Sequence, residues 1–335
     1  MLLLLRSRGL LSSSPSSPRF NSLVATVGYC YSSSTSPSSP SQPVTHKPYK
    51  NRRQAMSDSS TAPQEQPTES ELNAVVAALE AVRGRMSAAV AKRAEKAASS
   101  ASVSTSASDE HGRVAGEADA VRLVAVSKTK PNALLQAAYG AGQRHFGENY
   151  VQELVAKASG LPRDIQWHFI GHLQSNKASH VAAIPNLFVV ETVDSVKLAT
   201  ALEKACAKQT RDSPLRVFVQ VNTSGETSKS GSNAAEAIAV ARHIVNECPH
   251  LRLCGLMTIG QPGRQCSEAS PNPDFLLLNE IRQQTAESLS LRAADLELSF
   301  GMSDDFEHAI SMGSTNIRVG STIFGSRSYP AVHPE

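Results

Sequence analysis

The chain has 335 residues and a net charge of +3, with 40% of its residues hydrophobic and 19% charged. These values fit a soluble globular protein, and the small positive charge gives no argument for nucleic-acid binding. No apolar run approaches the roughly 20 residues of a membrane-spanning helix, so an integral membrane protein is excluded. The five cysteines are odd in number and lack C-x-x-C spacing, which favours free thiols in a reducing compartment over a zinc or redox site.

Residues 1–68 are rich in Ser and Pro, carry several arginines and have no acidic residue before Asp58. This composition predicts a disordered leader and is typical of an organelle transit peptide. A secretory signal is disfavoured, because Arg6 interrupts the initial leucine run before it reaches the length of such a signal. We expect a mitochondrial location, with a plastid as the alternative, and a cytoplasmic form if translation starts at Met56.

A helix is predicted for residues 70–98, because apolar side chains recur at three- and four-residue steps from Leu72 onward, with Ser70 as the N-cap. Residues 99–116 are then rich in Ser and Ala without periodicity, which predicts a flexible surface insertion. The expected domain covers residues 70–330 and includes this insertion.

From residue 121 to residue 325, short β-branched runs alternate with helical patterns. Such alternation predicts parallel strands with crossover helices, and eight strand candidates over roughly 200 residues match an α/β fold of the (β/α)8 TIM-barrel type. A doubly wound open sheet is the alternative, but no G-x-G-x-x-G follows the first strand. The expected strands are 123–127, 144–146, 166–170, 187–191, 217–221, 253–257, 296–300 and 316–319. The expected helices are 132–141, 150–158, 175–183, 195–208, 234–246, 274–288 and 304–312.

The first expected strand delivers a lysine to its carboxyl end. Lys128 follows the apolar run Val124–Val126, which would desolvate the base of the side chain and lower its pKa. A neutral amine can attack an aldehyde, although a lysine at a strand end also commonly just reaches solvent. Lys130 competes with Lys128, but Pro131 should open the next helix and turn Lys130 outward. We therefore favour Lys128.

Two further stretches follow the seventh and eighth strands, where such barrels commonly bind phosphate. In the first, Ser303 precedes a helix. In the second, Gly320 lets the backbone approach a ligand, and Ser321 and Thr322 add hydroxyl donors. Glycines and hydroxyls also make ordinary turns, so the argument depends on the position of both stretches together.

A lysine and a phosphate site at one end of a barrel indicate a Schiff base with a phosphorylated aldehyde. Pyridoxal 5'-phosphate (PLP) is the leading candidate. A sugar-phosphate lyase that uses a lysine Schiff base stays open, although we would expect its lysine later in the barrel with carboxylates beside it.

His168 and His172 have the spacing of a zinc-protease pair, but Phe169 stands where that motif has its glutamate. We expect no metal site here, and a polar loop or a satisfied core ring instead. The polar loop 222–231 follows the fifth strand and is interpreted as a solvated connection outside the site.

Six motifs, in order along residues 121–329, resemble the pyridoxal phosphate homeostasis family. They are Ala125-Val-Ser-Lys-Thr-Lys-Pro131, Phe146-Gly-Glu-Asn-Tyr-Val-Gln-Glu153, Trp167-His-Phe-Ile-Gly-His-Leu-Gln174, Gly255-Leu-Met-Thr-Ile-Gly260, Gly301-Met-Ser303 and Val319-Gly-Ser-Thr-Ile-Phe-Gly325.

The resemblance implies a single barrel similar to the N-terminal domain of alanine racemase, with PLP held as an aldimine on Lys128. Arg318 would face the pyridine nitrogen, and Asn149 would lie close to the cofactor. A permanent cation beside that nitrogen would keep it unprotonated and restrain carbanion chemistry. The phosphate would be held by residues of the two stretches above, namely Ser303, Gly320, Ser321 and Thr322.

The implied function is a carrier or buffer of PLP in vitamin B6 homeostasis, with PLP itself and PLP-dependent apoenzymes as the expected partners. The chain stops at Glu335, soon after the last motif, so we expect no second domain to supply a racemase's opposing tyrosine base. The alternative is a PLP-dependent amino-acid racemase or lyase. A third interpretation is a barrel that has lost its cofactor and binds only partners.

Overall fold

The computed structural model describes residues 66–101, 121–226 and 230–326. Most of the expected leader and most of the expected insertion lie outside these ranges. The transit peptide and the mitochondrial location therefore stay predictions.

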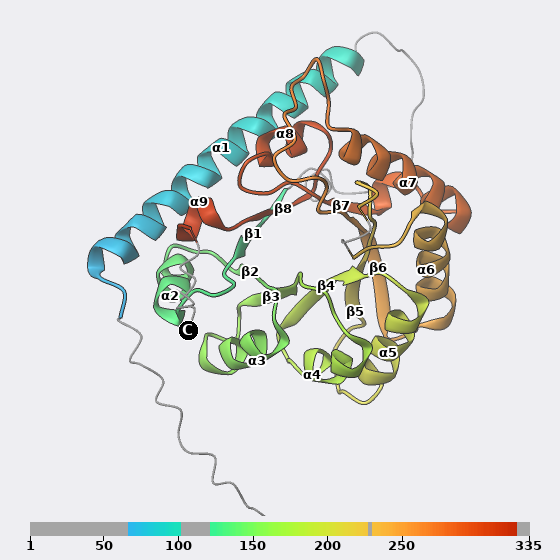
Figure 1. Cartoon of the computed structure of the whole chain (residues 1–335), viewed down its shortest axis with the longest axis horizontal. Coiled ribbons are helices and arrows are strands. Elements are labelled where there is room, and N and C mark those ends of the chain that lie inside the picture. The colour runs from blue at the N-terminus through green and yellow to red at the C-terminus, as the bar shows by residue number, and fades with distance from the viewer. Residues whose placement is uncertain (1–65, 102–120, 227–229, 327–335) are drawn as a thin grey trace, which may run out of the picture. The chain divides into compact units, whose positions relative to one another are not determined.

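Parallel strands form a closed barrel in chain order, in which each strand pairs with the next and the last pairs with the first (Figure 1). This confirms the predicted (β/α)8 barrel. The strands are β1 (Arg122–Val126), β2 (His145–Glu148), β3 (Gln166–Phe169), β4 (Leu187–Val193), β5 (Leu215–Gln220), β6 (Leu251–Met257), β7 (Glu297–Ser299) and β8 (Asn316–Val319).

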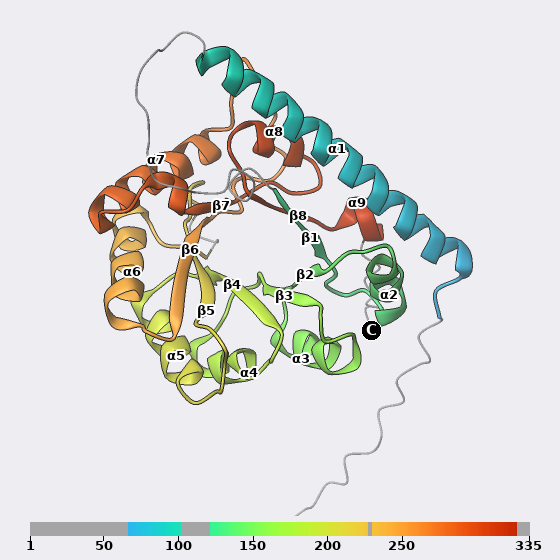
Figure 2. The same cartoon turned by 180° about the vertical axis from the view of Figure 1, so that it is seen from behind.

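Helices lie outside this ring, as Figure 1 and the reverse view in Figure 2 show. They are α1 (Glu69–Ala101), α2 (Asn132–Gly140), α3 (Val151–Gly160), α4 (Ala178–Ala182), α5 (Val196–Cys206), α6 (Ala234–Glu247), α7 (Pro273–Leu289), α8 (Phe306–Ser311) and α9 (Ser321–Phe324), with 3₁₀ turns at Ser175–Lys177 and Ala293–Asp295. The four-residue α9 was not predicted, and the helix expected at 175–183 is divided between a 3₁₀ turn and α4.

The strands are apolar because the barrel buries both of their faces. β1 carries Val124 and Ala125, both fully buried, and β5 buries Val217, Phe218 and Val219. One face of each strand packs against the helices and the other faces the inside of the barrel, where several side chains are polar. β3 and β8 therefore alternate between polar and apolar residues.

Helix α1 lies across α2, α8 and α9 and buries Val75, Leu79 and Val82 against them (Figures 1 and 2). Its predicted N-cap at Ser70 is wrong. Thr68 occupies that position, because its hydroxyl accepts a hydrogen bond from the Glu71 amide at 3.3 Å while the Glu71 carboxylate accepts from the Thr68 amide at 2.8 Å. This is a capping box, which satisfies two amides of the first turn.

Helix α8 begins at Phe306, two residues later than expected, with Asp305 as its N-cap. The Asp305 carboxylate accepts a hydrogen bond from the Met302 amide at 2.6 Å. This bond closes a turn that contains Ser303 and Asp304, so both residues precede the helix. Within the described ranges, no helix has the length and apolar character needed to cross a membrane.

Candidate functional site

A cavity of about 270 Å³ opens at the carboxyl ends of β1, β7 and β8. Most of the residues singled out from the sequence line this one cavity, although they come from opposite ends of the chain: Lys128, Ser303, Arg318, Gly320 and Ser321. The remaining lining residues are Val126, Lys130, Ile170, Met302, Asp304 and Gly325. The volume is close to the lower end of the range for small-molecule pockets, which is roughly 300 Å³.

Two of the predicted site residues do not line this cavity. Thr322 lies in a neighbouring groove beside α1 and α2. Asn149 directly follows β2, and its Oδ1 is buried without a hydrogen-bond partner among the described residues. A buried amide oxygen without a partner costs free energy, so Asn149 has unused hydrogen-bonding capacity near the end of the strand beside β1.

Backbone and hydroxyl groups meet closely after β7 and β8. The Gly320 amide donates to Ser303 Oγ at 3.2 Å, which joins the two predicted phosphate stretches. A Cβ added at Gly320 would lie 3.2 Å from Val126 Cβ and 3.3 Å from the Val126 carbonyl oxygen. These contacts are tight, so a glycine gives the chain its close approach to the end of β1.

The side chain of Arg318 is buried inside the barrel. Its Nη2 donates to the Thr258 carbonyl oxygen at 2.8 Å, its Nη1 donates to Ser299 Oγ, and the Glu191 carboxylate lies 3.7 Å away. Burial lowers the pKa of Arg318, while the charge of Glu191 raises it. Arg318 nevertheless stays a cation, because an arginine pKa begins far above neutral pH.

A chain of polar side chains continues from Glu191 through the barrel interior. Glu191 Oε1 lies 2.6 Å from His168 Nδ1, and His168 Nε2 lies 2.9 Å from His145 Nδ1 at the start of β2. Burial would raise the pKa of Glu191, but the hydrogen bond with His168 and the charge of Arg318 hold it at about 2. Burial, followed by the charge of His168, lowers the pKa of His145 to about 3.

His168 is thus a satisfied core ring, as the sequence indicated, while His172 is exposed, 3.1 Å from Ser230 Oγ. Within the described part of the chain, no cluster of three or more His, Cys, Asp or Glu side chains could hold a metal ion.

Lys130 does not turn outward as predicted. It is half-buried, lines the cavity together with Lys128, and donates from Nζ to the Ser326 carbonyl oxygen at 2.7 Å. Burial lowers the pKa of Lys130. The helix that Pro131 was expected to open does begin at Asn132, but the side chain of Lys130 folds back over the end of β8 and α9.

A buried ion-pair cluster contacts the turn that carries Lys128, and it was not predicted from the sequence. Lys157 Nζ lies 2.7 Å from Oε1 of Glu148 and 2.7 Å from Oε1 of Glu153. The spacing of Glu153 and Lys157, four residues apart on a helix, was a usable signal for a pair. Nothing in the sequence showed that the lysine is buried, because α3 otherwise has an ordinary amphipathic pattern.

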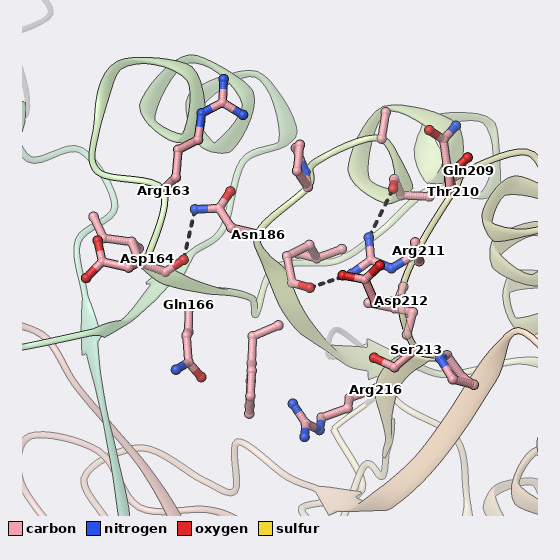
Figure 3. A pocket seen from close by; sticks show the side chains of 18 residues that line it. Arg163, Asp164, Gln166, Asn186, Gln209, Thr210, Arg211, Asp212, Ser213 and Arg216 are labelled. Carbon is pink, nitrogen blue, oxygen red and sulfur yellow. Dashed lines mark hydrogen bonds between the residues drawn. The ribbon is translucent and has the colours of Figure 1, made fainter.

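A larger hollow of about 650 Å³ lies at the opposite, amino-terminal end of β3, β4 and β5. Figure 3 shows Arg163, Arg211 and Arg216 around it. Arg211 is engaged in holding the backbone, since its Nη2 donates to the Leu187 carbonyl oxygen at 2.7 Å. Reactive groups of (β/α)8 barrels lie at the carboxyl ends of the strands, so the smaller cavity is the better candidate for chemistry.

Comparison with known proteins agrees with this fold. The family described as alanine racemase, N-terminal domain, matches residues 106–328. The human pyridoxal phosphate homeostasis protein is 53% identical over 213 residues, which cover 62% of this chain and 77% of that protein.

Two solved structures are similar as well. The crystal structure of an unknown protein from Bifidobacterium adolescentis has a TM-score of 0.63 at 33% identity and covers 78% of this chain and 98% of its own. The structure of PipY from Synechococcus elongatus with PLP bound has a TM-score of 0.51 at 36% identity and covers 61% of this chain and 92% of its own.

The fold and the site therefore define a single-barrel protein of the alanine racemase N-terminal-domain class. Within this class the chain belongs to the family of pyridoxal phosphate homeostasis proteins.

Proposed function

We propose that this protein binds PLP in the cavity at the carboxyl end of the barrel, through a Schiff base with Lys128, and that it carries or buffers the cofactor in vitamin B6 homeostasis. The observation that carries the proposal is the meeting of Lys128, Ser303, Arg318 and Gly320 in one cavity. The relatives named pyridoxal phosphate homeostasis protein and the PLP-bound PipY structure support it.

The residues present fit this group. An amine, a set of hydroxyl and backbone donors and a buried cation are the partners that an aldehyde, a phosphate and a ring nitrogen require. When bound, PLP supplies the aldehyde and an electron-accepting ring. The neutral amine of Lys128 would add to the aldehyde carbon, and the aldehyde oxygen would leave as water.

Arg318 would limit the chemistry at this site. Its guanidinium is fixed by Ser299, Thr258 and Glu191, and a fixed cation beside the ring nitrogen disfavours protonation there. Without that proton the ring withdraws electrons poorly. This supports a binding role over racemisation, which needs a stabilised carbanion.

The phosphate would be held by donors after β7 and β8. Ser303, Gly320 and Ser321 line the cavity together, and the Gly320 amide lies 3.2 Å from Ser303 Oγ. Neutral hydroxyl and amide donors of this kind bind a phosphate dianion without a lysine partner. Thr322 would join them only after a change of side-chain orientation toward the cavity.

Absorption spectroscopy with peptide mapping tests the proposal. The purified protein with added PLP should show the visible band of a protonated Schiff base, and borohydride reduction should place the label on Lys128. Lys128→Ala should lose both signals. A label on Lys130, or no band in the wild type, would contradict the assignment.

The carrier role and the enzyme alternative are separated by two further measurements. Loaded protein mixed with a PLP-dependent apoenzyme should restore that enzyme's activity faster than cofactor released into buffer. Incubation of the loaded protein with amino acids in deuterated water should give no exchange of the α-proton. Exchange at catalytic rates would favour the racemase or lyase.

A further inference from the structure

The turn that carries Lys128 is held in an unfavourable backbone conformation. It is closed by a hydrogen bond from the Lys130 amide to the Ser127 carbonyl oxygen at 3.0 Å. Thr129 at its centre has a φ of 62°, in the left-handed region. A β-branched residue adopts this region only at a cost, so contacts outside the turn must stabilise it.

The side chain of Lys157, on α3, supplies such a contact. Its Nζ donates to the Ser127 carbonyl oxygen at 2.7 Å and to Glu153 Oε1 at 2.7 Å. The same oxygen of Glu153 accepts a hydrogen bond from the Thr129 amide at 2.6 Å. The residues immediately before and after Lys128 are therefore both tied to one ion pair.

The ion pair is itself held in place by Glu148. Lys157 Nζ also donates to Glu148 Oε1 at 2.7 Å, and that oxygen accepts from Ser127 Oγ at 2.6 Å. The side chain of Lys157 is 6% exposed and that of Glu148 is 0% exposed. Burial raises the pKa of Glu148 to about 7, against the charge of Lys157. Buried charges are tolerated only with such partners, and they lock the geometry around them.

We propose that Lys157 is a positioning residue: it fixes the backbone on both sides of Lys128 and so directs the Lys128 amine, rather than that of Lys130, toward the aldehyde of the cofactor. Lys157 is not among the residues that line the cavity, so it acts through the Ser127 carbonyl and, by way of Glu153, through the Thr129 amide. The inference rests on the proposed function, because it concerns the lysine that the proposal assigns to PLP.

The physical basis is preorganisation. A reacting group held in place before the reaction does not lose freedom during it, and a misplacement of about 1 Å can cost on the order of 100-fold in rate. Lys128 and Lys130 lie two residues apart on one turn and both line the cavity. The conformation of this turn therefore decides which of the two amines faces the aldehyde of the cofactor.

The test compares Lys157→Met with Lys204→Met, which removes an exposed lysine from α5. For each, PLP association is followed by the Schiff-base band, the reduced label is mapped, and thermal unfolding without PLP is recorded. Lys157→Met should weaken PLP binding by roughly tenfold or more and should divide the label between Lys128 and Lys130. Lys204→Met should match the wild type in both.

The division of the label is the decisive signal, because a loss of stability alone would not move it from one lysine to the other. A folded Lys157→Met with wild-type affinity and label only on Lys128 overturns the inference. If Lys157→Met does not fold, Glu153→Ala decides, since the side chain of Glu153 is 21% exposed and alanine removes the acceptor of the Thr129 amide. It should weaken binding in the same direction with some label on Lys130, and an unchanged result overturns the inference. A wild type that binds no PLP would instead contradict the proposed function.

Discussion

The Nη1 atom of Arg318 lies 3.7 Å from Oε2 of Glu191 inside the barrel, and Ser299 Oγ contacts both side chains. Oε1 of the same carboxylate is bonded to His168. Glu191 therefore balances the charge of Arg318 and sets its position, although it does not line the cavity itself.

Replacement of Glu191 by Gln should destabilise the protein strongly. It leaves Arg318 buried without its counter-charge, and loss of one partner from a buried pair costs roughly 3–5 kcal/mol. Urea denaturation without PLP measures the free energy of unfolding. Glu307→Gln is the matched control, because its pair with Arg85 is about half exposed and should contribute less than about 1 kcal/mol. Equal losses in the two variants would contradict this ranking.

Alanine at Gly320 should weaken binding of the phosphate end of the cofactor. The added Cβ would press on Val126, and overpacking of this kind costs about 1–3 kcal/mol. The backbone would shift to relieve the contact, and this shift would displace the Gly320 amide from its place beside Ser303. Titration with PLP and with pyridoxal, which lacks the phosphate, measures the effect. Affinity for PLP should fall roughly tenfold with little change for pyridoxal, and equal losses would point to the aldehyde end instead.

Alanine at Gly84 should stabilise the protein. Gly84 is exposed in the middle of α1, and a Cβ there meets nothing within 4 Å. Glycine in a helix interior costs about 0.5–1 kcal/mol relative to alanine, so the free energy of unfolding should rise by about that amount. PLP affinity should not change, because α1 does not line the cavity. A fall in stability would contradict this account of α1.

His145 should make stability depend on pH in a defined window. Its pKa is lowered to about 3 from an ordinary 6.5, so between these values the unfolded state binds a proton that the folded state does not. The contribution of neutral His145 to the free energy of unfolding is fully present above pH 6.5. It is lost as the pH falls toward 3, at up to about 1.4 kcal/mol per pH unit.

Denaturation curves from pH 7 to pH 4 measure this effect. The advantage of the wild type over His145→Asn should shrink as the pH falls. His180→Asn, at an exposed position on α4, should run parallel to the wild type. A constant difference between the wild type and His145→Asn would contradict the assignment.

Much of the fold could be predicted from the sequence, because barrel strands are short apolar runs separated by regular helices. Every strand falls within two residues of its expected bounds, and β8 matches at both ends. The errors lie at helix starts and in the short helices, since α9 was not predicted and the helix expected at 175–183 is divided. Thr68 rather than Ser70 is the N-cap of α1, because its hydroxyl accepts a hydrogen bond from the Glu71 amide. Helix α8 begins two residues later than expected, after a turn in which the Asp305 carboxylate accepts from the Met302 amide.

The cavity could be predicted where it depends on strand ends, since parallel strands bring Lys128, Arg318 and Gly320 to one end of the barrel. Its finer geometry could not. The side chain of Lys130 turns back toward Ser326, and Thr322 faces the neighbouring groove. These orientations depend on contacts between segments far apart in the sequence, which no local pattern encodes.

The pairing of β1 with β8 has a consequence for how the molecule is made. Lys128 follows the first strand and Arg318 lies in the last, and the two strands meet only when the ring closes (Figures 1 and 2). A chain leaving the ribosome cannot assemble the cavity until almost all of it has emerged. Contacts between such distant segments also form late and slowly during folding. Only a chain with a closed barrel would therefore bind a ligand between these two residues, and partly folded chains would not bind it.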